Sequence, residues 1–250
     1  MRLNLQWVLA GTLIAAAARA QVPPRVVLVE LFTSEGCSSC PPADALLRKI
    51  NGVQTHTNEL VVGISEHVTY WNQLGWVDPF SDQIYTQRQN DYGERFGLDS
   101  VYTPQVVVNG ETQVLGSDGP AILKAVTKND HPSTVMLKID SVTRADPAKL
   151  AVTFSIDGLA GHGVDVYAVI TDDAATSSVA RGENTGRTLQ HVSVARSMSK
   201  VARVKDTTRM TISLPVPGLI KGQPETGRHL ILFAQEGGAG KVLAVSSKGL

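Results

Sequence analysis

The two cysteines of this chain, Cys37 and Cys40, are separated by two residues, and they are the only cysteines among 250 residues. The apolar run before them, residues 26–32, predicts a buried strand. Pro41 and Pro42 are tolerated only in the first turn of a helix, so a helix should begin at about Cys40 or Pro41. A strand, a C-x-x-C pair and a helix are typical of a thiol–disulfide redox site. A purely structural bridge is disfavoured, because so short a loop adds little stability when it is closed.

The same two thiolates can instead bind a soft metal ion such as Cu(I), or zinc. No second C-x-x-C pair and no close histidine pair completes a zinc site in the sequence. His67 is the histidine expected nearest to the cysteines and would be the third ligand. A copper- or zinc-binding delivery protein is therefore the alternative to a redox protein.

Residues 1–20 have the pattern of a secretory signal peptide. Arg2 precedes a mostly apolar stretch that is too short to span a bilayer comfortably, and Ala18-Arg19-Ala20 is a small-x-small cleavage sequence. No later run is long and apolar enough to cross a membrane, so no span is expected after cleavage. The expected location is periplasmic or secreted, where a cysteine pair can be oxidised.

The charge of the chain is balanced, with 23 basic and 23 acidic residues. It therefore lacks the excess of Lys and Arg that marks proteins binding nucleic acid or anionic membranes, and no nucleic-acid partner is expected. The expected partners of a redox pair are protein or small-molecule thiols and disulfides. The patterns imply no organic cofactor.

The two halves of the chain differ in their patterning. Residues 25–130 alternate strand-like and helix-like segments, which is typical of a sheet covered by helices. His131-Pro132 interrupts this pattern. Residues 132–250 contain about seven short strand-like runs, and this spacing predicts a β-sandwich. A further alternative follows, in which the β half is an adhesion or assembly module and the first half is a relic redox domain.

Within the β half, Asp172-Asp173 predicts a turn that ends a strand over residues 164–171. The charged segment at residues 181–187 has two interpretations, a functional loop and a solvated loop, and the second is favoured. Three histidines of this half are scattered without the spacing of metal ligands: His162, His191 and His229.

Three blocks of sequence resemble a known family. They are residues 29–44 (VELFTSEGCSSCPPAD), an aromatic block over residues 67–80, and residues 102–105 (YTPQ), with a weaker match at residues 181–187. In these blocks the chain resembles the bacterial secreted family called domain of unknown function 1223, and its first half resembles a thioredoxin-fold domain. The resemblance implies an α/β thioredoxin-like domain followed by an all-β sandwich-like domain.

The expected catalytic residues follow from position and from this resemblance. Cys37 lies on the turn side and is the expected attacking thiol, and Cys40 is the resolving thiol. The resemblance implies a cis bond between Thr103 and Pro104, in a loop that faces the dithiol. Glu30 interrupts an apolar strand and should be buried. One interpretation makes it a relay for the proton of Cys40, and the other pairs it with a base or places it at a sheet end.

An aromatic insertion, residues 66–80, follows the second predicted strand at its carboxyl end, the edge where α/β folds place their sites. Trp71, Trp76 and His67 are its candidate substrate-binding residues, as parts of a groove over Cys37. The alternative is a hydrophobic cluster that holds the insertion against the core. A lone histidine is also more often structural than functional.

Overall fold

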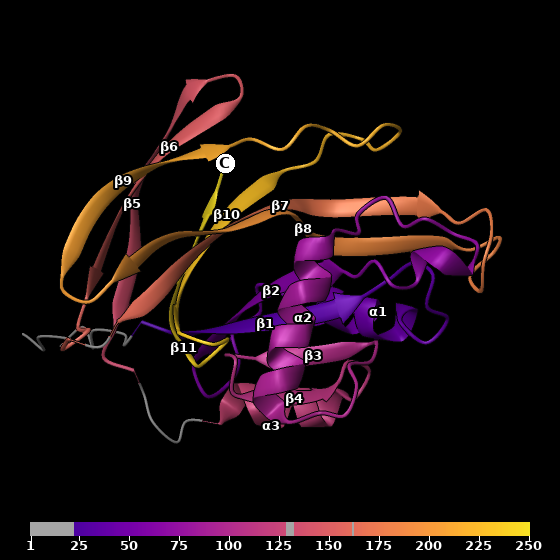
Figure 1. Ribbon diagram of the computed structural model, residues 1–250, viewed down its shortest axis with the longest axis horizontal. Coiled ribbons are helices and arrows are strands. Elements are labelled where there is room, and N and C mark those ends of the chain that lie inside the picture. Colours follow the sequence, from indigo (N-terminus) through magenta and orange to yellow (C-terminus); the bar gives the residue numbers. More distant parts are fainter. Residues whose placement is uncertain (1–22, 129–132, 162) are drawn as a thin grey trace, which may run out of the picture.

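The computed structural model describes residues 23–128, 133–161 and 163–250, and strands dominate it. Strand makes up 46% and helix 16% of the structure, arranged as a mixed eight-stranded sheet and a three-stranded sheet (Figure 1). The predicted signal peptide and the predicted boundary at His131-Pro132 lie outside the described residues. No helix within the described ranges is long and apolar enough to cross a membrane.

The first half of the chain contains all the α-helices of the described residues. Its elements are β1 (Arg25–Thr33), α1 (Pro41–Ile50), β2 (Glu59–His67), the short 3-10 helix η1 (Asn72–Leu74), α2 (Gln83–Phe96), β3 (Gln105–Val108), β4 (Thr112–Leu115) and α3 (Gly119–Thr127).

The second half is built from strands. They are β5 (Met136–Asp146), β6 (Lys149–Asp157), β7 (Val164–Ser178), β8 (Thr188–Val204), β9 (Thr208–Pro215), β10 (Arg228–Glu236) and β11 (Val242–Gly249). The strand order is β11-β10-β7-β8-β2-β1-β3-β4 in the large sheet and β5-β6-β9 in the small one.

β1 lies inside the large sheet, parallel to β2 and antiparallel to β3. Its continuous apolar run is that of a strand covered on both faces. Because side chains alternate along a strand, Val27, Val29 and Leu31 pack with α1 and α3. Leu28 and Phe32 lie on the opposite face, in clusters that include residues of α2. The strand that leads to the cysteines is therefore fixed between two helical layers.

The prediction of a thioredoxin-like domain followed by a separate β-sandwich is wrong. Four strands of the second half join the sheet of the first half, through the parallel pairing of β2 with β8 at Ser65 and Val194. The remaining three strands form the small sheet, which packs on β7 and β10 through an apolar cluster that includes Phe154 and Leu232. The two halves therefore share one sheet. The prediction failed because alternating patterns identify strands but do not say which distant strands pair.

The prediction of a turn at Asp172-Asp173 is also wrong, because both residues lie inside β7. The Asp172 carboxylate accepts hydrogen bonds from Arg196 of β8 and from Arg228 of β10. These partners neutralise the acid within the sheet, so the strand continues. The β7–β8 hairpin is therefore longer than predicted, and it reaches the end of the molecule where α1 begins (Figure 1).

A buried charge cluster joins α2 to the sheet. Glu30 has no exposed surface, as predicted, and it accepts hydrogen bonds from Arg88 and from the Tyr92 hydroxyl, the latter at 2.6 Å. Arg88 also donates to Gln235 of β10 at 3.2 Å. Burial and the neighbouring charge of Glu30 raise the pKa of Glu66 well above its usual value. Arg88 is therefore the cation that makes the buried Glu30 carboxylate tolerable.

Replacing Arg88 by Met should destabilise the protein by about 3–5 kcal/mol, because it leaves the Glu30 carboxylate buried without its counter-charge. Arg95→Met is the matched control, since Arg95 is exposed on the same helix, and it should cost less than about 1 kcal/mol. Denaturant unfolding of the oxidised protein measures both values. Equal losses in the two variants would contradict the role given to Arg88.

Candidate redox site

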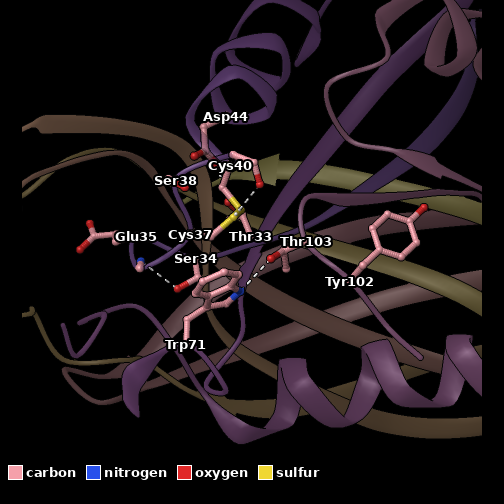
Figure 2. Close-up of a disulfide and its surroundings, with 12 residues drawn as sticks. Thr33, Ser34, Glu35, Cys37, Ser38, Cys40, Asp44, Trp71, Tyr102 and Thr103 are labelled. Atoms are coloured by element: carbon pink, nitrogen blue, oxygen red, sulfur yellow. Dashed lines mark hydrogen bonds between the residues drawn. A yellow bond between two sulfur atoms is a disulfide. The ribbon is translucent and has the colours of Figure 1, made fainter. Parts of the chain in front are cut away.

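Cys37 and Cys40 form a disulfide in the turn between β1 and α1, residues 34–40, here called the redox turn (Figure 2). The Cys37 N–H donates to the Ser34 carbonyl and the Cys40 N–H to the Cys37 carbonyl, both at 3.2 Å. The Ser39 hydroxyl oxygen lies 3.3 Å from Cys37 Sγ, where it can donate to a thiolate. Neither cysteine has exposed surface, so a thiol reagent reaches Cys37 only after the site opens.

The helix after the disulfide begins where the two prolines predict. Cys40 is the N-cap of α1, and Pro41 and Pro42 are its first two residues. Proline has no N–H, and the next two N–H groups, of Ala43 and Asp44, both donate to the Cys40 carbonyl. The helix therefore acts on the sulfurs through its dipole and not through free N–H donors.

The Thr103–Pro104 bond is cis, as predicted. Trp71 Nε1 donates to Thr103 Oγ1 at 2.8 Å, a bond drawn in Figure 2. Trp71 also lies against the redox turn, because a Cβ on Gly36 would come within 3.0 Å of Trp71 Cβ. Two predicted substrate-binding residues, Trp71 and Thr103, are thus joined to each other beside the redox turn.

Glu35 of the redox turn is fully buried and is held by the aromatic insertion. Trp76 Nε1 donates to Glu35 Oε2 at 2.8 Å, and the Glu35 N–H donates to Asp78 Oδ2 at 2.8 Å. His67 Nδ1 lies 2.7 Å from the same Asp78 oxygen. Burial opposes ionisation of Asp78, but the charge and hydrogen bond of His67 lower its pKa. Trp76 is thus hydrogen-bonded to Glu35, and the fully buried His67 is hydrogen-bonded to Asp78.

A second histidine, His191 of β8, lies between two carboxylates of the site. Its Nε2 is 3.3 Å from Glu35 Oε1, and its Nδ1 is 3.6 Å from Asp44 Oδ1. Burial disfavours the charged imidazolium, but hydrogen bonding and charge from Asp44 and Glu35 raise the pKa of His191 to about 10. His191 is therefore a cation at neutral pH.

Glu30 lies on the other side of the sheet from these groups. Its neighbours Val29 and Leu31 pack in the cluster with α1, whereas Glu30 bonds to Arg88 of α2. This arrangement matches the interpretation in which Glu30 pairs with a base. The buried acid on the α1 side, close to the disulfide, is Asp44.

The tip of the β7–β8 hairpin, residues 179–187, covers the redox turn, and we call it the cover. Asn184 Nδ2 donates to the backbone carbonyls of Glu35 and Cys37, both at 2.9 Å. Asn184 itself has no exposed surface. These two bonds satisfy buried carbonyls of the turn and fix the cover over the disulfide.

Further contacts anchor the cover. The Ser38 N–H donates to Glu183 Oε2 at 3.0 Å, and hydrogen bonds from Ser38 lower the pKa of Glu183. Arg187 Nη1 donates to Asn184 Oδ1 at 2.9 Å and orients the amide. The interpretation of residues 181–187 as a solvated loop is therefore incomplete, because this segment bonds to the redox turn.

Sequence reasoning missed the cover and His191. The signal for the cover was its weak match to the family, but its contacts depend on a strand pairing that local patterns do not contain. His191 carries no local signal at all. Within the ranges that the structure describes, no group of three His, Cys, Asp or Glu side chains is placed to hold a metal ion, and His67, the expected third ligand, is bonded to Asp78.

The sequence matches the family model described as "Protein of unknown function (DUF1223)" over residues 28–235. Among solved structures, it is similar to protein AGR_C_4864 from Agrobacterium tumefaciens, with 29% identity and a TM-score of 0.66, over 91% of this chain and 95% of that one. It is also similar to HBP35 of Porphyromonas gingivalis, with 14% identity and a TM-score of 0.62, over 92% and 77% of the two chains. That identity shows a shared fold alone. No curated protein matched the sequence.

Replacing Asn184 by Ala should speed reduction of the disulfide by dithiothreitol about tenfold, which corresponds to a loss of about 1.4 kcal/mol in closure of the cover. Each lost hydrogen bond contributes about 0.5–1.5 kcal/mol. The measurement is the rate at which thiols appear in the folded protein. Arg181→Ala, an exposed change in the same cover, should leave the rate unchanged. A wild-type rate in Asn184→Ala would show that Asn184 does not control access.

The stability of the protein should fall as the pH rises above neutrality. The pKa of His191 is about 10 in the folded protein against 6.5 ordinarily, so its stabilising charge is complete below about pH 6.5 and is lost through pH 10. Urea unfolding of the oxidised protein at several pH values measures this fall. It should be smaller in His191→Gln, and equal falls would rule out His191 as its source.

Proposed function

The chain belongs to the DUF1223 family, whose function is unknown, and we propose that it is a thiol–disulfide oxidoreductase that uses Cys37 and Cys40. The observation that carries the proposal is the disulfide across two residues at the start of α1. A bridge over so short a loop stabilises the fold little by restricting the unfolded chain. A helix N-terminus, by contrast, favours the thiolate that exchange chemistry needs.

The reaction starts when a substrate thiolate attacks Cys37 Sγ. A bond forms between the substrate sulfur and Cys37 while the Cys37–Cys40 bond breaks, and Cys40 leaves as a thiolate. A second substrate thiolate then attacks the substrate sulfur of this mixed disulfide. It releases the substrate as a disulfide, and the two protein sulfurs take up two protons from solvent. Two electrons pass from the substrate thiols to the protein, and the reverse sequence reduces a substrate disulfide while the Cys37–Cys40 bond forms again.

The surroundings support the assignment of roles to the two sulfurs. The Ser39 hydroxyl near Cys37 Sγ can donate to the Cys37 thiolate and favour it over the thiol. Cys40 lies at the helix start, four residues before the buried Asp44. Cys37 is thus the sulfur that exchanges with substrate, and Cys40 is the one that resolves the mixed disulfide.

The substrate is a protein or small-molecule thiol or disulfide, and it enters when the cover moves. Displacement of Asn184 frees the carbonyls of Glu35 and Cys37 that it now occupies. Trp71 and Thr103 stand beside the redox turn and form the wall along which the substrate is placed.

A location outside the cytoplasm is part of the same proposal. A disulfide persists in oxidising compartments and is rare in the reducing cytosol. The signal-like pattern of residues 1–20 leads in the same direction. We therefore propose a periplasmic or secreted protein.

The test of this function is reversible exchange at the cysteine pair. The folded protein should gain two thiols in dithiothreitol and lose both in oxidised glutathione, as counted by alkylation and mass. Cys40→Ser should accumulate a mixed disulfide at Cys37, because the resolving thiol is absent, whereas Cys37→Ser should not accumulate a comparable adduct. A disulfide that resists dithiothreitol until the protein unfolds would overturn the assignment.

A further inference from the structure

His191 brings a positive charge from the second half of the chain to the redox turn. It lies on β8, is 2% exposed, and stands between Glu35 and Asp44 at 3.3 and 3.6 Å. Glu35 belongs to the turn that holds Cys37, and Asp44 belongs to the helix that Cys40 begins. One imidazole thus contacts the segments on both sides of the disulfide.

The other charged groups around His191 have partners of their own. The ring of His67 lies 4.7 Å from that of His191, edge to face, and it is bonded to Asp78. Arg48 of α1 donates to the backbone carbonyl of Gln190, next to His191. Because these groups have other partners, the charges that remain for the His191 imidazolium to balance are the two buried carboxylates of Glu35 and Asp44.

Asp44 connects this charge to the sulfurs. It follows Cys40 by four residues at the start of α1, and side chains at this spacing lie on the same side of a helix. Figure 2 shows Asp44 in the first turn of α1 next to Cys40, with Glu35 on the far side of the redox turn. Thr33 donates to Asp44 Oδ1 at 3.0 Å and fixes the carboxylate in this place.

When the disulfide opens, a new negative charge appears in this buried region. Two carboxylates already lie there, and like charges disfavour a thiolate. A leaving thiol departs faster when its pKa is lower. A cation between the carboxylates therefore makes departure of Cys40 easier.

We propose that His191 is a positioning residue whose imidazolium offsets the charges of Glu35 and Asp44 and so allows Cys40 to leave as a thiolate. The inference rests on the proposed function, since it concerns the exchange step at Cys37. In that step the substrate sulfur bonds to Cys37, the Cys37–Cys40 bond breaks, and the electron pair stays on Cys40. No proton moves, and His191 remains protonated.

The main experiment compares wild type with His191→Gln, reduced and folded, by the absorbance of the thiolates as a function of pH. The Gln variant should raise the pKa of the Cys40 thiol, measured in a Cys37→Ser background, by about one unit, at the low end of shifts caused by a nearby charge. Its oxidised form should react about tenfold more slowly with dithiothreitol near neutral pH. His229→Gln removes the matched surface histidine, which pairs with Asp173 at 2.6 Å, and should change neither value.

A double variant separates charge from packing. Asp44→Asn combined with His191→Gln removes a carboxylate together with its cation, so the thiol pKa and the exchange rate should return most of the way to wild type. If His191 only fills space, the second substitution will give no rescue. Unchanged thiol pKa values in His191→Gln, or a double variant as slow as the single one, would overturn the inference.

Two further measurements cover a variant that does not fold and separate this inference from the proposed function. If His191→Gln does not fold, the His191 ring nitrogens of the reduced wild type can be followed by NMR, and their shifts should track the cysteine titration; ring shifts indifferent to it would overturn the inference. The proposed function fails on a different result, namely a wild-type disulfide that thiols cannot reduce in the folded protein. The thiol pKa comparison still decides the role of His191 in that case, on protein reduced in denaturant and refolded.

Discussion

The parallel pairing of β2 with β8 is the constraint on which the site depends. It is short, with Ser65 opposite Val194, and the Ser193 hydroxyl reinforces it by donating to the Gly63 carbonyl at 2.6 Å. This pairing sets β8 beside the strand that ends at the aromatic insertion. The preceding residues of β8 and the cover are then carried onto the redox turn, which is how His191 reaches its two carboxylates. The C-terminal half thus completes the site that the N-terminal half begins.

Glu35 shows what this completion achieves. A buried carboxylate is costly unless other groups compensate its charge and satisfy its hydrogen bonds. Trp76 donates a hydrogen bond to the side chain, and His191 lies 3.3 Å from it as a counter-charge. Asp78 accepts from the backbone N–H, and Asn184 donates to the carbonyl. Partners from the insertion, from β8 and from the cover therefore meet at one residue, two positions before Cys37. The shape of the redox turn is fixed by both halves of the chain together.

Local patterns predicted what local forces determine. The buried first strand, the helix start at Pro41 and the burial of Glu30 follow from an apolar run, from proline geometry and from the cost of a mid-strand acid. The cis bond before Pro104 came from the family resemblance. The shared sheet and the long hairpin could not be read in this way, since the arginines that keep Asp172 within a strand lie on other strands. His191 was invisible for the same reason, because its partners are distant in sequence.

The cover shields the disulfide in the closed structure but is held over it by few contacts. Behind the tip, β7 and β8 are paired along most of their length, with two shifts of register. The hydrogen bonds of the cover to the redox turn come from Asn184 and Glu183. Hydrogen bonds contribute about 0.5–1.5 kcal/mol each, so lifting the tip costs a few kcal/mol and leaves the strand pairing intact. Local openings of this size are ordinary in folded proteins. The exchange proposed for Cys37 would therefore proceed through a minor open state, while the closed cover shields the disulfide.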